Sequence, residues 1–526
     1  MRILSFKPGH DGAVAFLDEG RLVFSLESEK DSYPRYGDIT PAVVAEAMEL
    51  CDALPDVICL GGWVKGYNVN ERPIGAGYYG WQDNSVRHGT TKVFGKQVKT
   101  FTSSHERSHL MSAYGMSPFV NERPCYGLVW EGYIGSFYEY GPRGEVTLIQ
   151  EVMREAGIKY QYLFSLADPT TTTDFGGFRF SNAGKLMALA AFGAPDRVGP
   201  EGRALIEFIL DQRDILQTVP KANLADSPYH DIGVRSPEFT DLAAAHSQRI
   251  FEQFHDVAAR KLTKGYPLII SGGCGLNCDW NSQWRESGLF EDVFIPPVPN
   301  DAGSALGTAV DAQRHFTGDA RIEWDPYAGA EFRHDLDRPG ARFEHDPSGL
   351  DGAARVLADG GIIAWVQGRC EIGPRALGNR SILASASVPD MQARLNHVKG
   401  REDYRPIAPV CRAEDVEEFF HWSAPSPYML HFQKVRDPRR LPAVTHVDGT
   451  ARTQTVTAEE NAALHDLLGR FGTLSGVPVL CNTSLNFNGT GFINRTSDLV
   501  DYVLTRDLAG FWLDGSFYRT RKTGNR

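Results

Sequence analysis

Residues 1–27, MRILSFKPGHDGAVAFLDEGRLVFSLE, contain three apolar stretches separated by two turns. The first turn, PGHDG at residues 8–12, follows Lys7, and the second, DEG at residues 18–20, precedes RLVFSLE. Apolar stretches that are bounded by glycine-containing turns are typical of β-hairpins. We therefore expect the fold to begin with three antiparallel strands.

The first of these turns also carries residues that can do chemistry. It places His10 and Asp11 between glycines, where bare backbone N–H groups can meet an anion. Asp and Gly are also common in turns for purely conformational reasons, which explains the same residues without a ligand. This stretch alone leaves both interpretations open.

The composition of the whole chain limits the classes of function. At 526 residues the chain is too long for a single core and predicts two or three domains. A net charge of -12 and a pI near 5.7 argue against nucleic acid or an anionic membrane as the main partner. Residues 1–20 lack the apolar core of a signal peptide, and no apolar run reaches membrane-spanning length. We expect a cytoplasmic protein with neither partner.

Eight cysteines are scattered along the chain, which favours reduced core thiols over a disulfide framework. Cys274 and Cys278 form the only close pair, and a single pair does not complete a zinc site. Metal or redox chemistry at this pair is the less favoured interpretation.

Helix and strand patterns alternate along the rest of the chain, which predicts an α/β fold. An expected helix at residues 39–54 precedes a strand at 56–62, and helices follow at 183–193 and 240–265. Residues 154–183 are polar and rich in turn-forming residues, so they predict a long loop near a functional surface.

A buried strand at residues 266–271 runs into Gly272 and Gly273 and then into a helix. Such a glycine turn after a buried strand is where α/β folds bind phosphates. The charged, turn-rich residues 316–350 predict a linker between domains. The second domain is expected to begin with a helix at 350–360 and a strand at 361–368.

Two histidines and two carboxylates have the arrangement expected of a metal site. His105 and His109 lie four residues apart on a predicted helix, so both imidazoles share one face. Asp301 follows an apolar strand and precedes a helix, and Glu131 ends another buried strand as a possible fourth ligand or an outer polar group. Two half-buried histidines without a metal remain the simpler interpretation of the pair alone.

Residues 369–412 are basic in an otherwise acidic protein, with eight Arg or Lys against four Asp or Glu. Clustered guanidinium groups match phosphate oxyanions, although a solvated basic face explains the same composition. Short polar residues after a later buried strand can also hydrogen-bond a nucleotide or phosphate. The candidates in this part of the chain are Arg375, Arg380, Lys399, Arg401, Arg405, Arg452, Asn482 and Ser484.

Taken in order, these motifs resemble those of the O-carbamoyltransferase family of natural-product biosynthesis, which includes nodulation-factor, aminoglycoside and cephem enzymes. The matching segments are GHDGA, SLESEK, SSHERSH, NAGKLMALAAFG, ISGGCGLNCDWN, NDAGSALGTA, EIGPRALGNRSILA, KGREDYRPIAP, THVDGTARTQTV and CNTSLN. They span almost the whole chain. Four segments most resemble the sequences of the cephem hydroxymethyl branch of this family: FKPGHDGAVA, SLESEKDS, FGKQV and VWEG.

The resemblance implies two catalytic domains. Residues 1–335 are expected to form an actin-like ATPase-type domain similar to the threonylcarbamoyl-tRNA-forming enzymes, and residues 345–526 a YrdC-like domain. In the family, the YrdC-like domain makes carbamoyl-adenylate from carbamoyl phosphate and ATP, releasing phosphate and pyrophosphate. The other domain then transfers the carbamoyl group to a substrate hydroxyl and releases AMP.

The same resemblance implies roles for individual residues. His10 is expected to serve as general base or oxyanion partner, and Fe²⁺ or a similar divalent metal to be held by His105, His109, Asp301 and Glu131, although many relatives have Asp-Gly where this chain has Glu131-Gly132. Mg²⁺ is expected to accompany ATP. The expected nucleotide-binding residues of the first domain are Arg35, Gly184, Gly272, Gly273 and Asn277. Those expected to bind carbamoyl phosphate and ATP are Arg375, Arg405, Arg452, Asn482 and Ser484.

The expected acceptor is a small natural product with a primary or sugar hydroxyl, such as a 3-hydroxymethylcephem, a macrolide or another glycoside. Residues 67–81 and 170–180 are candidates for contacting it, with surface packing as the equal alternative. One other function class is an actin-like kinase or ATPase with a regulatory C-terminal domain. Another is a tRNA-modification scaffold, which the acidic composition disfavours. The oligomeric state stays open.

Overall fold

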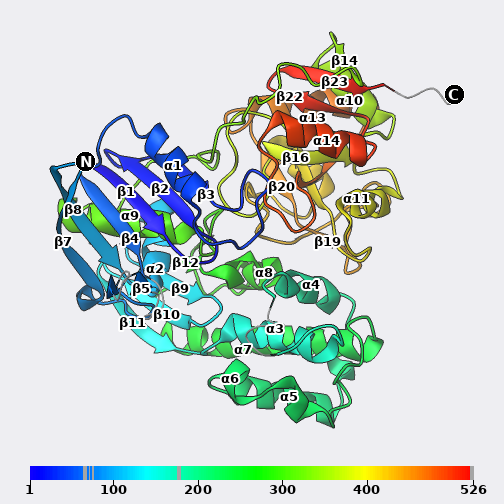
Figure 1. Cartoon of the computed structure of the whole chain (residues 1–526). Helices are drawn as coiled ribbons and strands as arrows, with labels where there is room; N and C mark the ends of the chain where they lie inside the picture. Colours follow the sequence, from blue (N-terminus) through cyan, green and yellow to red (C-terminus); the bar gives the residue numbers. More distant parts are fainter. Residues whose placement is uncertain (63–67, 70–71, 74–75, 174–178, 522–526) are drawn as a thin grey trace. The chain divides into compact units, whose positions relative to one another are not determined.

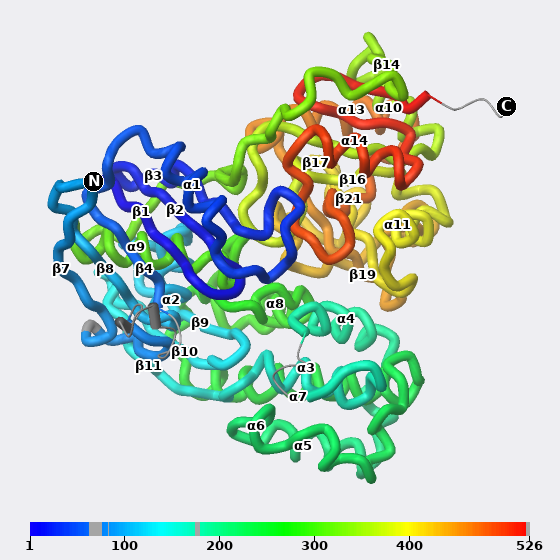
Figure 2. The backbone as a smooth tube through the Cα atoms, viewed as in Figure 1, coloured from blue at the N-terminus to red at the C-terminus, as the bar shows by residue number. Residues whose placement is uncertain are grey.

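The computed structural model describes residues 1–62, 68–69, 72–73, 76–173 and 179–521, and Figures 1 and 2 show the course of the chain. The chain divides into two compact units. Unit 1 consists of residues 1–8, 16–21 and 53–323, and unit 2 consists of residues 9–15, 22–52 and 324–526. Both units mix helices and strands, so the α/β class is confirmed. The segments 67–81 and 170–180 lie partly outside the described residues.

The first sheet has six strands in the order β3-β2-β1-β4-β8-β7. Its strands are β1 (Arg2–Lys7), β2 (Ala13–Asp18), β3 (Arg21–Glu27), β4 (Val57–Gly61), β7 (Val86–Val93) and β8 (Lys96–Ser103). β4 runs parallel to both β1 and β8, whereas β7 is antiparallel to β8. The three N-terminal strands and their two turns therefore lie where the sequence predicts them. The predicted helix that precedes β4 is α1 (Pro41–Leu50).

The second sheet has five strands in the order β11-β10-β9-β12-β13. They are β9 (Cys125–Trp130), β10 (Gly135–Tyr140), β11 (Val146–Glu151), β12 (Leu268–Ser271) and β13 (Val293–Phe294). Helix α2 (His105–Met116) packs on β9 and β12, and α9 (Gly303–Thr317) packs on β1, β4 and β8 and against α2. The two helices thus lie between the two sheets.

The close approach of α2 and α9 depends on a glycine. A Cβ atom at Gly307 would lie only 1.8 Å from the carbonyl oxygen of Ser108, so a larger residue would push the helices apart. Beside this crossing, the hydroxyls of Ser108 and Thr308 are 2.8 Å apart. The small residues of this part of α9 therefore fix the spacing of the two helices.

Helices α3 to α7 form a separate helical part of unit 1, drawn in cyan and green in Figure 1. They are α3 (Ala156–Ala167), α4 (Ser181–Ala190), α5 (Pro200–Asp211), α6 (Ile215–Thr218) and α7 (Pro237–Lys261). Helix α3 corrects the predicted loop at 154–183. Its sequence, AGIKYQYLFSLA, is mostly apolar and aromatic, and every residue of it is buried, Lys159 and Gln161 included. A helix enclosed in this way shows no amphipathic pattern.

Unit 2 contains an eight-stranded sheet in the order β14-β23-β22-β15-β16-β21-β17-β20. Its strands are β14 (Phe343–Asp346), β15 (Ile362–Val366), β16 (Arg380–Ser385), β17 (Ala408–Arg412), β20 (Gln454–Val456), β21 (Val479–Ser484), β22 (Gly510–Leu513) and β23 (Ser516–Thr520). Its main helices are α10 (Leu350–Ala358), α11 (Met391–Lys399), α13 (Ala462–Ser475) and α14 (Thr496–Thr505). The predicted linker at 316–350 thus includes β14, an edge strand of this sheet.

Strand β15 shows why helices cover both faces of this sheet. Ile362, Ala364 and Val366 belong to the hydrophobic core that includes α11 and α14. Ile363 and Trp365 belong to the other core, which includes α10 and α13. Successive side chains of a strand point to opposite faces, so a continuous apolar run is buried on both sides.

All eight cysteines are described, and all are free thiols. In the described part of the chain, no helix is both long enough and apolar enough to cross a membrane.

Candidate functional site

The N-terminus of α2 presents two histidines to one point in unit 1. Ser104 caps the helix, because its hydroxyl accepts a hydrogen bond from the Arg107 N–H at 3.1 Å. His105 and His109 follow one turn apart and are both buried. Their Nε2 atoms lie 3.2 Å apart. The predicted four-residue spacing on one helical face therefore holds.

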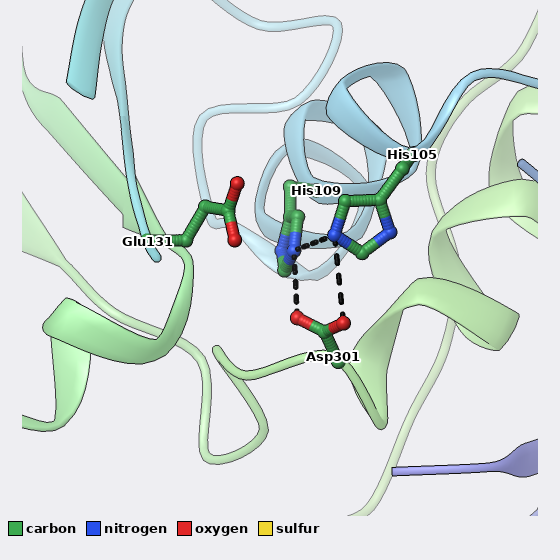
Figure 3. A group of neighbouring side chains, drawn as sticks. All are labelled: His105, His109, Glu131 and Asp301. Atoms are coloured by element: carbon green, nitrogen blue, oxygen red, sulfur yellow. Dashed lines mark hydrogen bonds and ion pairs between the residues drawn. The ribbon is translucent and has the colours of Figure 1, made fainter. Parts of the chain in front are cut away.

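Two carboxylates complete this cluster (Figure 3). Asp301 lies between β13 and α9, with Oδ1 3.3 Å from His109 Nε2 and Oδ2 3.5 Å from His105 Nε2. Glu131 directly follows β9. One potential ligand atom from each of the four residues lies within 4.8 Å of the others. The structure thus brings together all four residues that the sequence analysis grouped as metal ligands.

The charges of this cluster favour a bound cation. Burial, together with the nearby negative charge of Asp301, raises the pKa of Glu131 to about 7. The buried ammonium of Lys7 lies 3.2 Å from Asp301 Oδ2 and balances one negative charge. A divalent cation among these atoms would favour the ionised form of both carboxylates. Two imidazole nitrogens with carboxylate oxygens are a donor set that suits Fe²⁺ and similar metals.

The predicted glycine turn lies against the backbone that carries Glu131. A Cβ atom on Gly272, whose φ is +96°, would lie 2.3 Å from the Trp130 carbonyl oxygen and 2.7 Å from Glu131 Cβ. Only glycine fits this approach. The Gly272 N–H donates to the Pro299 carbonyl at 2.7 Å, which ties the turn to the segment before Asp301.

The other expected nucleotide-binding residues of this unit lie on three elements. Gly273 begins the 3₁₀ turn Gly273–Leu276, and Asn277 caps α8 (Cys278–Glu286) by accepting from the Asp279 N–H at 3.1 Å. Both therefore lie beside the glycine turn. Gly184 lies on α4 and is half-buried.

A second charged cluster lies in unit 2 and is cationic. Burial and the neighbouring charges of Arg405 and Arg452 lower the pKa of Arg401 to about 9. Burial and nearby arginines also lower the pKa of Lys399. Arg452 Nε is buried and has no hydrogen-bond partner among the described residues. Lys399 is buried, and Arg401, Arg405 and Arg452 are half-buried. Cations gathered in this way indicate a site for a polyanion.

Arg35 belongs to this cationic cluster. Its positive charge contributes to the lowered pKa values of Lys399 and Arg405, in addition to their burial. Its backbone N–H donates to the Gly489 carbonyl at 3.1 Å, and Pro34 forms a β-bridge with Thr490. The structure therefore groups Arg35 with the basic residues of unit 2, and Gly272 and Asn277 with unit 1.

Polar groups at the C-terminal end of β21 and just after it contact the Lys399 ammonium. Lys399 Nζ donates to the Ser484 carbonyl and to Asn486 Oδ1, each at 2.5 Å. Asn482 Nδ2 donates to Gln454 Oε1 at 2.7 Å. These contacts place Ser484 beside Lys399, whereas Asn482 pairs with Gln454. Both residues lie within β21 and not after it, which corrects the prediction from the sequence.

Arg375 lies in the loop between β15 and β16, which wraps around one carboxylate. Glu371 Oε1 accepts hydrogen bonds from the backbone N–H groups of Leu377 and Asn379 at 2.7 and 2.8 Å. The Ala376 carbonyl accepts from Asn482 Nδ2 at 3.1 Å. The loop that carries Arg375 is therefore fixed to both β16 and β21.

His10 lies in the first turn of the chain, in unit 2. Its Nδ1 is 2.9 Å from Asp11 Oδ2, and its side chain is 30% exposed. Asp11 has a positive φ of 52°, which Asp adopts more readily than most residues. The imidazole is thus oriented by a carboxylate while part of it stays accessible, an arrangement that suits a proton acceptor.

Models of one protein family match most of the chain. The model described as the carbamoyltransferase N-terminus matches residues 77–310, and the model described as the carbamoyltransferase C-terminus matches residues 354–520. The first range includes all four residues of the histidine–carboxylate cluster. The second includes the basic residues from Arg375 to Arg452.

Known proteins similar to the chain along its whole length include two that share one name. The 3'-hydroxymethylcephem-O-carbamoyltransferases of Streptomyces clavuligerus and Amycolatopsis lactamdurans are 50% and 49% identical to it, over 99% of each chain. Nodulation protein U of Sinorhizobium fredii is 33% identical over 99% of each chain. A solved ROK family glucokinase from Streptomyces griseus, in complex with glucose and AMPPNP, is 12% identical, covering 60% of this chain and 100% of that one, with a TM-score of 0.29. A likeness this weak carries no conclusion.

Proposed function

This chain belongs to the carbamoyltransferase family and is an enzyme of that class, and we propose that it moves the carbamoyl group of carbamoyl phosphate to a hydroxyl by way of carbamoyl-adenylate. The 50% identity to a 3'-hydroxymethylcephem-O-carbamoyltransferase makes a 3-hydroxymethylcephem the first acceptor to test. Hydroxyls of macrolides and other glycosides follow.

The observation that carries this proposal is the cationic cluster of unit 2, in which Lys399 is buried and the arginines are half-buried. We assign the triphosphate of ATP, with Mg²⁺, and carbamoyl phosphate to this cluster. Burial and the positive charges of Arg405 and Arg452 lower the pKa of Arg401. Burial and the charges of Arg35 and Arg452 lower the pKa of Arg405. A polyanionic ligand would offset the repulsion between these positive charges. Guanidinium groups also bind phosphate oxygens in a bidentate manner. Arg375, Asn482 and Ser484 border the same ligands in this assignment, and Arg35 joins them from the N-terminal segment of unit 2.

In this proposal, the formation of carbamoyl-adenylate consumes one water molecule. Carbamoyl phosphate and water give carbamate and phosphate, and a carbamate oxygen then forms a bond to the α-phosphorus of ATP. The bond from that phosphorus to the bridging oxygen breaks, and pyrophosphate leaves. The role of the cationic residues is to hold both anions in contact and to offset the charge that develops on the leaving group.

We assign the metal and nucleotide contacts of the transfer step to residues of unit 1. His105, His109, Asp301 and Glu131 would hold Fe²⁺ or a similar divalent metal, which would supply Lewis-acid stabilisation of an adenylate or carbamoyl oxygen. The glycine turn at Gly272 and Gly273, with Asn277, would accept the nucleotide by backbone N–H groups. Gly184 is a further candidate on α4.

His10 completes the transfer as general base. The acceptor oxygen bonds to the carbamoyl carbon, the bond from that carbon to the adenylate oxygen breaks, and AMP leaves. The imidazole takes the hydroxyl proton, and a histidine is suited to this at neutral pH. The contact between His10 Nδ1 and Asp11 Oδ2 orients the imidazole.

The family resemblance also supports a proposal on the fold. We assign the actin-like ATPase type to unit 1, in which α2 and α9 lie between two sheets, and the YrdC-like type to the C-terminal part of unit 2.

A product assay tests the proposed function. The purified protein is incubated with ATP, carbamoyl phosphate and a panel of alcohols that begins with a 3-hydroxymethylcephem. We expect AMP and pyrophosphate only when carbamoyl phosphate is present, and an acceptor whose mass increases by CHNO. A kinase with a regulatory C-terminal domain would instead release ADP, and that result would refute the adenylate route.

A further inference from the structure

Tyr78 joins two members of the histidine–carboxylate cluster through a single side chain. Its hydroxyl donates to Glu131, with Oε1 at 2.8 Å and Oε2 at 3.0 Å. Its ring stacks on the imidazole of His105, with centroids 4.4 Å apart and planes at 29°. Tyr78 thus contacts a carboxylate that follows β9 and an imidazole on α2 at the same time.

The backbone around Tyr78 is held by the same helix that carries the histidines. The carbonyls of Gly77 and Tyr78 accept hydrogen bonds from the first N–H groups of α2, those of His105 at 3.1 Å and Glu106 at 2.9 Å. The Glu106 carboxylate in turn accepts from the Gly80 N–H at 2.6 Å. These contacts satisfy N–H groups that a helix start leaves open, and they fix Tyr78 relative to His105.

Each carboxylate of the cluster therefore has its own partner. Asp301 is held by the Lys7 ammonium at 3.2 Å, and Glu131 is held by Tyr78. The partners differ in kind, since Lys7 carries a charge and the phenol of Tyr78 is neutral.

We propose that Tyr78 is a positioning residue of the metal site, which orients the Glu131 carboxylate as a ligand and fixes the ring plane of His105. The proposal rests on the proposed function, because it takes the cluster as a metal site. A glutamate side chain has three rotatable bonds, and without a partner its carboxylate samples orientations that do not face the metal. Hydrogen bonds to metal ligands of this kind typically contribute 10-fold to 100-fold in metal affinity.

The test uses the full-length protein, freed of metal and titrated with Co²⁺ as a spectroscopic probe. The dissociation constant comes from competition with a chelator, and the coordination of the ion from its visible absorption. Tyr78→Phe removes one oxygen and keeps the stacking ring. We expect it to weaken Co²⁺ binding by about 10-fold or more and to change the absorption bands.

Two further variants show whether the effect passes through Glu131. Tyr79 is the adjacent tyrosine and is 56% exposed, so Tyr79→Phe is the matched control and should leave both measurements unchanged. Glu131→Ala removes the other half of the contact, should itself alter the spectrum, and should make Tyr78→Phe silent in that background. Wild-type affinity and spectrum in Tyr78→Phe, or an undiminished effect in the Glu131→Ala background, would overturn the proposal.

The histidines separate this proposal from the proposed function. If His105→Ala and His109→Ala bind Co²⁺ as tightly as the wild type, the metal assignment fails and the role of Tyr78 fails with it. If both variants lose Co²⁺ while Tyr78→Phe keeps wild-type binding, only the role of Tyr78 is refuted.

Discussion

Arg107 and Asp311 form a buried, bidentate ion pair that joins α2 to α9. Arg107 Nε donates to Asp311 Oδ2 at 2.6 Å, and Nη2 donates to Oδ1 at 2.9 Å. Helix α2 carries His105 and His109, and α9 begins just after Asp301. The pair therefore connects the two helices that bring the histidines and the aspartate of the candidate metal site together.

Asp311→Ala is expected to destabilise unit 1 strongly. It leaves the Arg107 guanidinium buried without its carboxylate, and loss of one partner of a buried pair typically costs about 3–5 kcal/mol. Urea unfolding measures the change. Asp351 pairs with Arg470 on the surface at 2.6 Å, so Asp351→Ala is the matched control, with an expected change below about 1 kcal/mol. Equal changes in the two variants would mean that burial adds nothing to the pair.

The two histidines of the cluster lead to a prediction on metal content. His105→Ala or His109→Ala is expected to lose bound iron, because each removes a nitrogen donor from a site with two. Elemental analysis of the purified variants measures the loss, and the transfer of the carbamoyl group should slow more than adenylate formation. The exposed His88 on β7 is the control, and His88→Ala should keep the wild-type metal content. Full metal content in both site variants would remove the metal assignment.

Arg405 leads to a prediction that separates the two half-reactions. Arg405→Ala is expected to abolish carbamoyl-adenylate formation, since it removes a charge-assisted contact from the cationic cluster. Transfer from supplied carbamoyl-adenylate should stay largely intact. Arg439, whose side chain is 91% exposed, offers the control Arg439→Ala, which should change neither step. If both half-reactions fall together in a folded Arg405→Ala protein, the assignment of the two steps to different clusters is wrong.

The histidine–carboxylate cluster could be predicted because local chemistry marks each of its members. The serine cap and the four-residue spacing identify His105 and His109, and Glu131 and Asp301 each follow a buried strand. No cap, residue spacing or strand end identifies Tyr78 in the sequence. Its contact with Glu131 joins residues 53 positions apart, and nothing in the aromatic segment around it distinguishes Tyr78 from Tyr79.

The fold shows the same difference between local and long-range information. The turns after Lys7 and Asp18 define the first three strands. In contrast, the polar stretch near residue 170 led to the prediction of a loop where α3 lies. The placement of Arg35 depends on contacts with Gly489 and Thr490, far along the chain. Sequence patterns report periodicity and caps, but they do not report which distant segments meet.

The turn that opens the chain gives the last prediction. His10→Asn is expected to keep the turn, because Asn is tolerated in such positions. It should also keep the AMP formation that depends on carbamoyl phosphate, since we assign the adenylate step to the cationic cluster. Carbamoylation of the acceptor should nevertheless fall by about 100-fold or more, as expected when a positioned base is lost.

The competing account holds that His10 only shapes the turn. It draws on the contact between His10 Nδ1 and Asp11 Oδ2 at 2.9 Å, which could serve folding alone. Asn can keep a side-chain hydrogen bond to Asp11, but it cannot accept a proton near neutral pH. The structural account therefore predicts near-normal transfer by His10→Asn. Separate assays of AMP formation and acceptor carbamoylation distinguish the two, because only loss of a base lowers the second while the first is unchanged.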